Sequence, residues 1–347
     1  YNYEKYGDIY EIHLNGRFII LCRAKYIKKL LTPSTKNSHG LEELGVSGKG
    51  ILINNNFKSW KYNRQFFAQA ILSPKFTNEA IDWTNKLFNE LEAYFDTLSD
   101  GKSDYPSAII DLRLDELLRR VTRQEIENTS LDKPLPNDML TSVITANTPR
   151  DVNYTKTVGG EALDRPMTDS EIRGIIFDGF LGGSDTTANE ISFIIYYIAH
   201  NSDVKKKMIE EINRIFQGDK IPIVKEVSRI FPVSNLFSRC IENSDEIAGY
   251  QWPAGTMFRI NADPDKFNPD RWMVEGFEPN KHSLLMFGGR LRICPGKKLV
   301  MIELICLMAL LYRKYEIDLV DMNSPLKTIS SSVIVCTELL VEIKPRD

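Results

Sequence analysis

The stretch FGGRLRICPGKKL, residues 287–299, sets Cys294 between Arg292 and the pair Pro295-Gly296, just before a long apolar helical pattern. A cysteine at a helix N-terminus meets unpaired backbone N–H groups and the positive end of the helix dipole, and Arg292 adds a nearby positive charge. This environment favours an anionic sulfur, able to ligate a metal or to act as a nucleophile. The alternative is a buried cysteine that serves as a small apolar side chain.

The composition is that of an ordinary globular protein. Its 347 residues are 42% hydrophobic and carry a formal net charge of −3, with no dominant basic run, so nucleic acid is not an expected partner. The 5 cysteines are scattered without metal-ligand spacing, which favours reduced thiols over a disulfide framework. No run of about 18 apolar residues occurs, so this chain alone predicts no transmembrane segment.

Short β-structure is predicted at the two ends of the sequence. The segment GDIYEIHLNGRFIILC, residues 7–22, alternates like two strands around Asn15-Gly16, a typical hairpin turn. Residues 329–343 have the pattern of a terminal hairpin. Strands and helices do not alternate and no GxGxxG occurs, which argues against a dinucleotide-binding fold.

Helical periodicity covers most of the remainder. Thr168 and Glu171 form the capping box of a long helix that reaches about His200. A further helix follows Cys294 and ends near Tyr315. Other helical patterns cover residues 57–98, 111–144, 203–216 and 223–230. The sequence therefore predicts a mainly α fold with small β-sheets, an α+β class.

The stretch FDGFLGGSDTTANEI, residues 177–191, places two glycines inside the long helix. Each costs about 1 kcal/mol relative to alanine, so Gly182-Gly183 indicates that something large and flat packs against this face. Asp185, Thr186 and Thr187 then place a carboxylate and two hydroxyls beside the gap, where they can relay protons to a bound oxygen species. The alternative is a kinked core helix whose threonines bond back to the preceding turn.

Two further pairs lie one helical turn apart. Glu226 and Arg229 can form an i, i+3 ion pair, which Arg271 in the sequence FNPDRW can join. In WKYNR, the indole of Trp60 and the guanidinium of Arg64 can grip a carboxylate. An ordinary half-exposed helix face explains either spacing equally well.

Taken in order along the chain, these motifs resemble the cytochromes P-450, the haem-thiolate monooxygenases. The opening KYGDIYEIHLNGR is most similar to eukaryotic, membrane-anchored members. The motifs that carry the resemblance are Trp60-x-x-x-Arg64, Gly182-Gly183-x-Asp185-Thr186-Thr187, Glu226-x-x-Arg229, Phe267-x-Pro-x-Arg271 and Phe287 to Gly296 around Cys294. The resemblance implies a single domain over residues 1–347, β-rich at 1–55 and helical and haem-binding at 56–347.

Haem b is the cofactor that the resemblance implies. Cys294 would be the axial thiolate of the haem iron, with Phe287 beside the sulfur and Gly296 admitting a bulky neighbour. The side chains implied to hold the haem propionates are Trp60, Arg64, Arg239 and Arg292. Those implied to form a supporting ion network are Glu226, Arg229 and Arg271.

The resemblance also implies where the chemistry takes place. Asp185, Thr186 and Thr187 would serve oxygen activation and proton delivery, with Thr186 at the family's usual alcohol position. An apolar small-molecule substrate would lie in a pocket lined by Phe177, Phe180, Leu181 and residues 233–236.

Electrons would come from NADPH through a partner reductase of the cytochrome P-450 reductase type. An electropositive surface for this redox partner is formed by Arg290, Arg292, Lys297 and Lys298, unless these residues are simply a solvated face. Association with the endoplasmic reticulum membrane is implied by the family, although no anchor is present in this chain.

Two features depart from the family pattern. Arg290 stands where the haem loop nearly always has glycine, which predicts a backbone conformation unfavourable to a side chain and a strain of about 1–3 kcal/mol. The intervals from Trp60 to Thr186 and from Arg229 to Cys294 are short, and whole helices are missing between Glu127 and Asn137. We therefore expect a shortened copy of the fold, with several elements missing.

The main hypothesis is a haem-dependent monooxygenase that inserts one atom of molecular oxygen into an apolar organic substrate. The alternative is a catalytically inactive haem-binding remnant or truncated product of a cytochrome P-450. A helical scaffold without a cofactor is the third possibility, and it leaves the Gly182-Gly183 pair without a cause.

Overall fold

The fold was analysed in a computed structural model of the chain. The residues that the structure describes are 5–13, 16–23, 25–26, 30–31, 35–36, 47–52, 54–97, 102–104, 139–145, 148, 165–213, 222–234, 238–260, 267–272, 274, 286–330 and 333–346. The expected loss of helices between residues 127 and 137 therefore lies outside the described residues.

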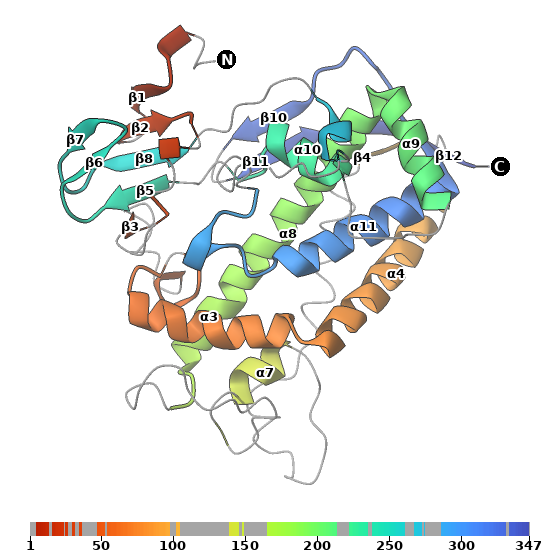
Figure 1. Ribbon diagram of the computed structural model, residues 1–347. Coiled ribbons are helices and arrows are strands. Elements are labelled where there is room, and N and C mark those ends of the chain that lie inside the picture. The colour runs from red at the N-terminus through yellow and green to blue at the C-terminus, as the bar shows by residue number, and fades with distance from the viewer. Residues whose placement is uncertain are drawn as a thin grey trace.

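Helices form the body of the protein (Figure 1). The α-helices are α3 (Phe57–Ile71), α4 (Pro74–Asp96), α7 (Met139–Thr145), α8 (Asp169–Ala199), α9 (Ser202–Asn213), α10 (Pro222–Ile230) and α11 (Lys297–Lys314). The short 3-10 helices are η1 (Ser47–Lys49), η3 (Pro269–Trp272) and η4 (Arg290–Arg292). With the small sheets below, these elements confirm the mainly α, α+β class.

The strands form small sheets at the periphery. They are β1 (Ile9–His13), β2 (Arg17–Leu21), β3 (Thr35–Lys36), β4 (Lys102–Asp104), β5 (Ser238–Ile241), β6 (Asp245–Ile247), β7 (Tyr250–Trp252), β8 (Met257–Ile260), β9 (Tyr315–Leu319), β10 (Lys327–Ser330), β11 (Ile334–Glu338) and β12 (Leu340–Pro345). The largest sheet has the order β1-β2-β8-β5-β3, with β2 parallel to β8 and the other neighbours antiparallel.

The structure confirms one of the two predicted hairpins fully and the other only in part. The first is confirmed, because β1 and β2 pair antiparallel from Ile9–Leu21 to His13–Arg17. The second is correct only in part, because β10 and β11 form the hairpin while β12 pairs with β9 and β4 in a separate sheet.

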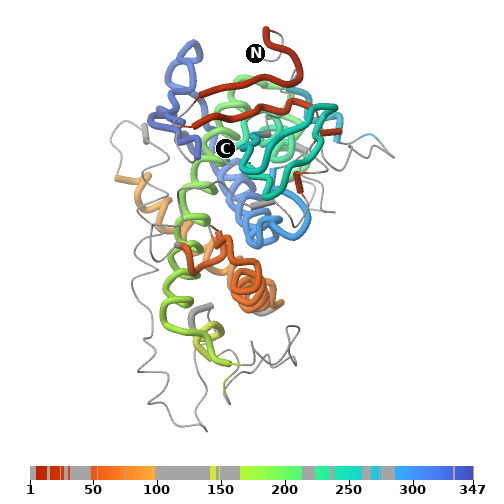
Figure 2. The backbone as a smooth tube through the Cα atoms, turned by 90° about the vertical axis from the view of Figure 1, so that its left-hand side faces the viewer, coloured from red at the N-terminus to blue at the C-terminus, as the bar shows by residue number. Residues whose placement is uncertain are grey.

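Helix α8 is the central element. Figure 2 shows it running along the length of the helical body, with α3 beside one half and the C-terminal strands at the other end. Its start confirms the predicted capping box, since Glu171 N donates to Thr168 Oγ1 at 3.3 Å and Thr168 N donates to Glu171 Oε2 at 2.9 Å. The pattern predicted for residues 57–98 is two helices, because Ser73 caps a new helix at Pro74.

The core follows the length of α8. Its C-terminal half packs with α4, α10, α11 and the strands β9, β11 and β12 around Ile194, Leu304 and Leu311. Its N-terminal half packs with α3 and α7 around Phe66 and Ile175. The stretch 182–187 lies between these two clusters, so packing on both sides fixes the middle of α8.

No helix among the described residues is long and apolar enough to cross a membrane.

Candidate functional site

Cys294 lies in the loop between η4 and α11. Its N–H donates to Phe287 O at 2.8 Å, which closes the loop, and the backbone N–H groups of Gly296 and Lys297 bond to its sulfur. Burial nevertheless raises the pKa of the Cys294 thiol above its ordinary value, although these N–H groups and the charges of Arg64 and Lys297 act to lower it. Burial therefore opposes the anionic sulfur that the sequence predicts, while the N–H groups at the helix start and the nearby charges favour it.

Nothing in the described part of the chain requires a glycine at Gly296. Its φ is −79°, which any residue adopts, and an added Cβ would meet only Cys294 Sγ, at an ordinary van der Waals distance of 3.8 Å. A glycine here leaves space beside the sulfur that no described side chain fills.

Arg290 has a left-handed backbone with φ of 52°, which confirms the unfavourable conformation predicted at this position. Its side chain is exposed. Only one other non-glycine residue in the described part of the chain has a positive φ, Ala248 at 59°. Arg290 therefore strains the loop that holds Cys294 and gains no buried contact in return.

Trp60 brings the predicted arginines together. Its ring has the guanidinium of Arg292 at 4.1 Å and that of Arg64 at 5.4 Å from its centre. Arg292 Nη2 donates to Asn54 O at 2.8 Å, and Arg64 Nη2 donates to Ile293 O, next to Cys294. Trp60 is itself fixed, because its Nε1 donates to Ile51 O at 3.0 Å.

Arg239 completes what we call the arginine cluster, Arg64, Arg239 and Arg292. It lies on β5, is buried, and bonds through Nη1 to Ser238 O at 2.9 Å. Burial and the nearby charges of Arg239 and Arg64 lower the pKa of Arg292 to about 10. Arg292 Nη1 is buried and has no hydrogen-bond partner among the described residues. Three positive charges close together, with one N–H group unbonded, favour the binding of a molecule that carries carboxylates, as haem carries its propionates.

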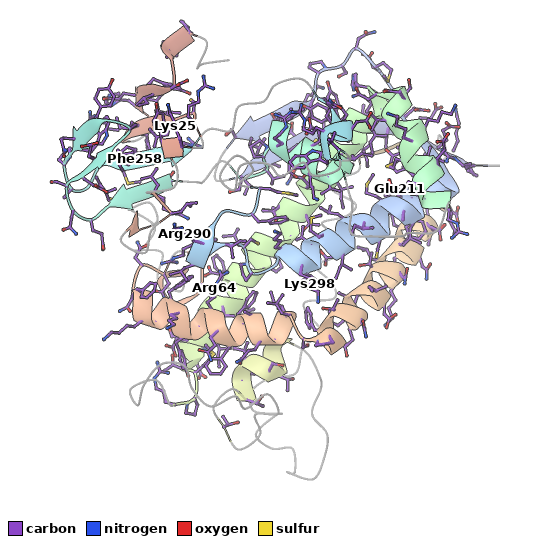
Figure 3. All side chains as sticks on the ribbon, in the orientation of Figure 1. Lys25, Arg64, Glu211, Phe258, Arg290 and Lys298 are labelled. Carbon is purple, nitrogen blue, oxygen red and sulfur yellow. The ribbon has the colours of Figure 1, made fainter. Side chains whose placement is uncertain are left out.

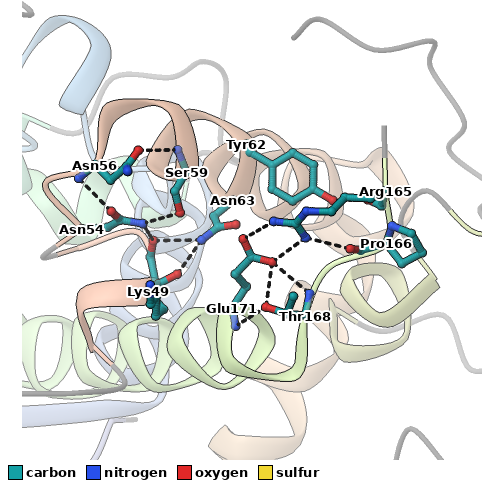
Figure 4. Close-up of polar contacts among 11 residues, drawn as sticks. Lys49, Asn54, Asn56, Ser59, Tyr62, Asn63, Arg165, Pro166, Thr168 and Glu171 are labelled. Carbon is teal, nitrogen blue, oxygen red and sulfur yellow. Dashed lines mark hydrogen bonds and ion pairs between the residues drawn. The ribbon is translucent and has the colours of Figure 1, made fainter. Parts of the chain in front are cut away.

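The turn before α3 holds this cluster in place, and sequence reasoning missed its residues. Asn54 is 1% exposed; its Nδ2 donates to Gly50 O and to Ser59 Oγ, while its own carbonyl accepts from Arg292. Asn63 Nδ2 donates to Gly50 O at 3.3 Å (Figure 4). The run of asparagines at residues 54–56 gave a turn signal, but it identified no partner.

Asp178 fastens the same turn to α8. Its Oδ2 accepts from Ile51 N at 2.6 Å and from Leu52 N at 2.7 Å, and a Cβ on Gly50 would overlap the carboxylate. Burial raises the pKa of Asp178, although these hydrogen bonds act to lower it. The position of Asp178, one turn before Gly182, does not indicate in the sequence that its carboxylate binds backbone N–H groups so far away along the chain.

The start of α8 is anchored on α3 by a second polar group, also seen in Figure 4. Arg165 makes two hydrogen bonds to Glu171, at 2.9 and 2.8 Å, and its guanidinium lies 5.1 Å from the centre of the Tyr62 ring. Tyr62 OH donates to Arg165 O. Together with Asp178, this fixes α8 relative to Trp60.

The predicted catalytic residues lie in the middle of α8. Thr186 Oγ1 donates to Gly182 O at 2.5 Å and Thr187 Oγ1 donates to Gly183 O at 2.9 Å, so both threonines bond back to the preceding turn. An added Cβ at Gly182 or Gly183 would meet nothing within 4 Å. The described chain thus leaves an open face at the glycines, and the hydroxyl of Thr186 lies at its border.

The apolar residues predicted to line a pocket are in part on the same helix. Phe177, Phe180 and Leu181 are exposed by 48%, 36% and 40%, although they are large and apolar. Val233 is instead buried in the core and accepts from Ile334 N, while residues 235–236 lie outside the described residues.

The predicted ion network is confirmed. Glu226 is fully buried and accepts from Arg229 Nη2 at 2.8 Å and from Arg271 Nε at 3.1 Å. Two further donors complete it, Trp272 Nε1 and Asn268 N, each at 2.8 Å. Burial acts to raise the pKa of Glu226, but the hydrogen bonds from Arg229, Asn268 and Trp272 hold it below its ordinary value.

The electropositive surface is smaller than predicted. Arg290, Lys297 and Lys298 are exposed around the Cys294 loop, and Figure 3 labels Arg290 on η4 and Lys298 at the start of α11. Arg292 does not contribute to this surface, because its guanidinium turns inward to Trp60 and Asn54.

Comparison with known proteins identifies the family. The family model described as cytochrome P450 matches residues 109–345. Curated relatives include methyltetrahydroprotoberberine 14-monooxygenase of Papaver somniferum, 29% identical over 51% of this chain and 40% of the relative. Cytochrome P450 4d1 of Drosophila melanogaster is 27% identical over 70% of this chain and 51% of the relative.

A third relative is the mitochondrial sterol 26-hydroxylase of Rattus norvegicus, 26% identical over 49% of this chain and 37% of the relative. The matches thus span about half or less of the length of these relatives. The motif order, the mainly helical fold and the match over residues 109–345 agree: the chain belongs to the cytochrome P450 family.

Proposed function

We propose that this protein is a haem-thiolate monooxygenase that inserts one atom of molecular oxygen into an apolar organic substrate. The observation that carries the proposal is the contact of Arg64 Nη2 with Ile293 O, which brings the arginine cluster next to Cys294. The open face at Gly182 and Gly183 and the family match support it. Haem, when bound, supplies the redox-active iron that activates oxygen.

The residues would share the work as follows. Cys294 is the iron ligand, with Phe287 and Gly296 shaping the loop around it. The arginine cluster holds the propionates, because Arg292 Nη1 offers an unused buried donor. This is the feature that best fits an acidic cofactor, since a buried cation without an anion is costly. The indole N–H of Trp60 is taken by Ile51 O, so Trp60 acts through its ring, which positions the arginines.

Proton delivery belongs to the middle of α8. Thr186 is half-buried, so its hydroxyl can accept a hydrogen bond at the open face while it donates to Gly182 O. To pass a proton, the hydroxyl gives up its bond to Gly182 O and donates at the open face. Asp185 supplies an acid beside it, and Thr187, 1% exposed, supports the turn. Phe177, Phe180 and Leu181 offer the apolar contact surface for the substrate.

The carbon-monoxide difference spectrum of reduced, haem-reconstituted protein tests the ligand assignment. We expect the red-shifted Soret band of a thiolate-ligated haem, and its loss in Cys294→Ala. Cys306→Ala is the matched control, since Cys306 is a half-buried cysteine on α11. A wild-type protein without the band, or a band that survives in Cys294→Ala, would contradict the proposal.

Electrons would come from NADPH through a cytochrome P-450-type reductase that docks on Arg290, Lys297 and Lys298. Full turnover requires this partner, so product formation with reductase and NADPH is the second test. The exchange of these side chains for glutamate should slow reduction of the haem without changing the carbon-monoxide spectrum.

A catalytically silent haem-binding protein is the second candidate. The left-handed Arg290 in the ligand loop favours it. It predicts a normal carbon-monoxide band together with no product and no NADPH consumption beyond that of the reductase alone. Turnover that is lost in Thr186→Val would exclude it.

Membrane association and a location at the endoplasmic reticulum are the proposed setting. The family resemblance supports both. The alternative location is the mitochondrion, because the rat relative is a mitochondrial protein. Fractionation of cells that express the natural gene distinguishes microsomal from mitochondrial protein.

We also propose that residues 1–347 act as one domain, which predicts a single cooperative unfolding transition.

A further inference from the structure

Glu190 is a carboxyl group that the proposed function does not use. It lies on α8 one turn after Thr186 and is buried, with 6% of the residue exposed. Its side-chain partner is Ser228 Oγ on α10, a residue that is 3% exposed and lies between Glu226 and Arg229. This contact joins the helix of the proposed catalytic residues to the helix of the ion network.

The hydrogen-bond geometry determines where the proton lies. Ser228 Oγ is in hydrogen-bond contact with Glu190 Oε1 and also 2.8 Å from Val224 O. A hydroxyl has one proton, so an ionised Glu190 would leave two acceptors competing for it. If Glu190 is protonated, its O–H donates to Ser228 Oγ, and Ser228 O–H donates to Val224 O. In this arrangement each of the two contacts has its own proton.

We propose that Glu190 is a neutral carboxylic acid in the native protein and that it clasps α8 to α10 through Ser228. It is a positioning residue, since it acts on the relative placement of Thr186 and Glu226 and touches neither the cofactor space nor the substrate face. The clasp holds only while the carboxyl keeps its proton.

The surroundings favour the neutral form. Burial raises the pKa of Glu190 from 4.5 to about 8, while the hydrogen bond with Ser228 acts to lower it. The titratable groups on α10, β11 and α11, the elements packed around this turn, include Lys225, Glu226, Arg229, Cys336, Glu338 and Tyr312. Among the described residues, none of these adds a hydrogen bond or a charge effect to Glu190. Glu226 and Arg229 are already paired with each other.

The clasp makes stability depend on pH in a defined direction. The folded-state pKa lies above the ordinary value, so native protein holds a proton that unfolded chains release. The stabilising contribution is complete below about pH 4.5 and is lost as pH rises through about 8. In native protein, loss of the proton near pH 8 leaves a buried carboxylate and Val224 O competing for one hydroxyl proton.

The direct test is infrared spectroscopy of the cofactor-free protein. We expect the carbonyl band of a protonated carboxylic acid at pH 6, its decrease as pH rises through about 8, and its absence from Glu190→Gln. A wild-type spectrum without such a band, or an identical band in Glu190→Gln, would overturn the proposal. If the Glu190 variant does not fold, the same titration is carried out in Asp178→Asn, which removes the other buried carboxyl group with a raised pKa. A band that is lost in Asp178→Asn would overturn the proposal.

Thermal unfolding supplies a second readout. Glutamine keeps the shape of Glu190 and donates an N–H to Ser228 Oγ at every pH, so Glu190→Gln should flatten the fall in Tm between pH 5 and pH 8. Glu342→Gln is the control, because Glu342 is a half-exposed residue paired with Lys344, and it should leave the slope as in wild type. Equal slopes in wild type and Glu190→Gln would refute the clasp.

Discussion

The guanidinium of Arg292 lies 4.1 Å from the centre of the Trp60 ring, and its Nη1 is buried without a hydrogen-bond partner among the described residues. The ring accounts for the position of the side chain, but it does not satisfy the buried donor. Trp60 and Arg292 are therefore arranged to bind an acidic group, and the unsatisfied donor lowers the stability of the cofactor-free protein.

Arg292→Met should consequently have opposite effects on folding and on binding. Removal of a buried, poorly compensated charge should leave the cofactor-free protein equally stable or more stable, by about 1–2 kcal/mol. Haem affinity should fall by about 10- to 100-fold, because a charge-assisted hydrogen bond is lost. Thermal unfolding and a Soret titration measure the two effects. Arg173→Met, at an exposed arginine of α8, is the control that should change neither. A parallel loss of both properties would contradict the assignment.

Arg290→Gly should relieve the left-handed backbone at φ of 52°. We expect a gain of about 1 kcal/mol in the free energy of unfolding, since the relief exceeds the extra entropy of an unfolded glycine. The thiolate-type carbon-monoxide band should sharpen. Ala248→Gly is the matched control, because Ala248 has a φ of 59° outside the site. It should gain similar stability and leave the spectrum unchanged. A spectrum of Arg290→Gly identical to wild type would show that the strain does not reach the sulfur.

Glu226→Gln should cost about 3–5 kcal/mol, because it breaks a fully buried ion network from its centre. The pKa of Glu226 is held below its ordinary value, so its stabilising effect is present above about pH 4.5 and is lost as pH falls through the lowered value. Wild type should therefore lose more stability on acidification than the variant. Lys207→Met removes an exposed pair with Asp270 and should leave the stability nearly unchanged, because solvent screens this pair. Denaturant unfolding at pH 7 and pH 4 measures both. Similar small losses in the two variants would mean that the network is unimportant.

Thr186→Val should lower substrate turnover by about 100-fold or more if its hydroxyl delivers protons. Thr187→Val is closely matched, since each threonine bonds back to a glycine carbonyl four residues earlier. The Thr187 variant should affect folding similarly but turnover much less. The measurement is product formation with reductase at saturating substrate. Equal losses in both variants would assign the effect to helix geometry and not to proton transfer.

Asp178→Asn should cost about 1–3 kcal/mol, because an amide satisfies the N–H groups of Ile51 and Leu52 less well than a carboxylate. Gly50→Ala should be at least as damaging, since its Cβ would overlap the same carboxylate. Both should weaken haem binding, because the turn they loosen carries the acceptors of Trp60 and Arg292. Denaturant unfolding and a Soret titration test this. Full haem affinity in a folded Asp178→Asn protein would separate the turn from the site.

Local patterns predicted the elements well. The Thr168 capping box, the pairing of β1 with β2 and the Glu226–Arg229 pair depend on residues close in sequence, and the structure confirms each. The unfavourable backbone of Arg290 was predicted from the family resemblance, because the haem loop of that family nearly always has glycine at this position.

Long-range polar contacts could not be predicted in this way. Asp178 meets a backbone 127 residues away, and Glu190 meets a serine 38 residues away. The balance between burial and local charge at Cys294 also depends on packing, which the sequence around it does not contain. These are the properties that a single sequence leaves open.

The pairing of β2 with β8 has a consequence for how the protein is made. Phe18 pairs in parallel with Met257, so β2 can pair with β8 only after most of the chain has been synthesised. Until then, the edge of the hairpin, with its apolar residues Ile19 and Ile20, has no neighbouring strand. During synthesis this edge is an open template for other nascent chains. Expression at low temperature, or together with chaperones that cover β-edges, should therefore decide whether the recombinant protein accumulates folded or as aggregates.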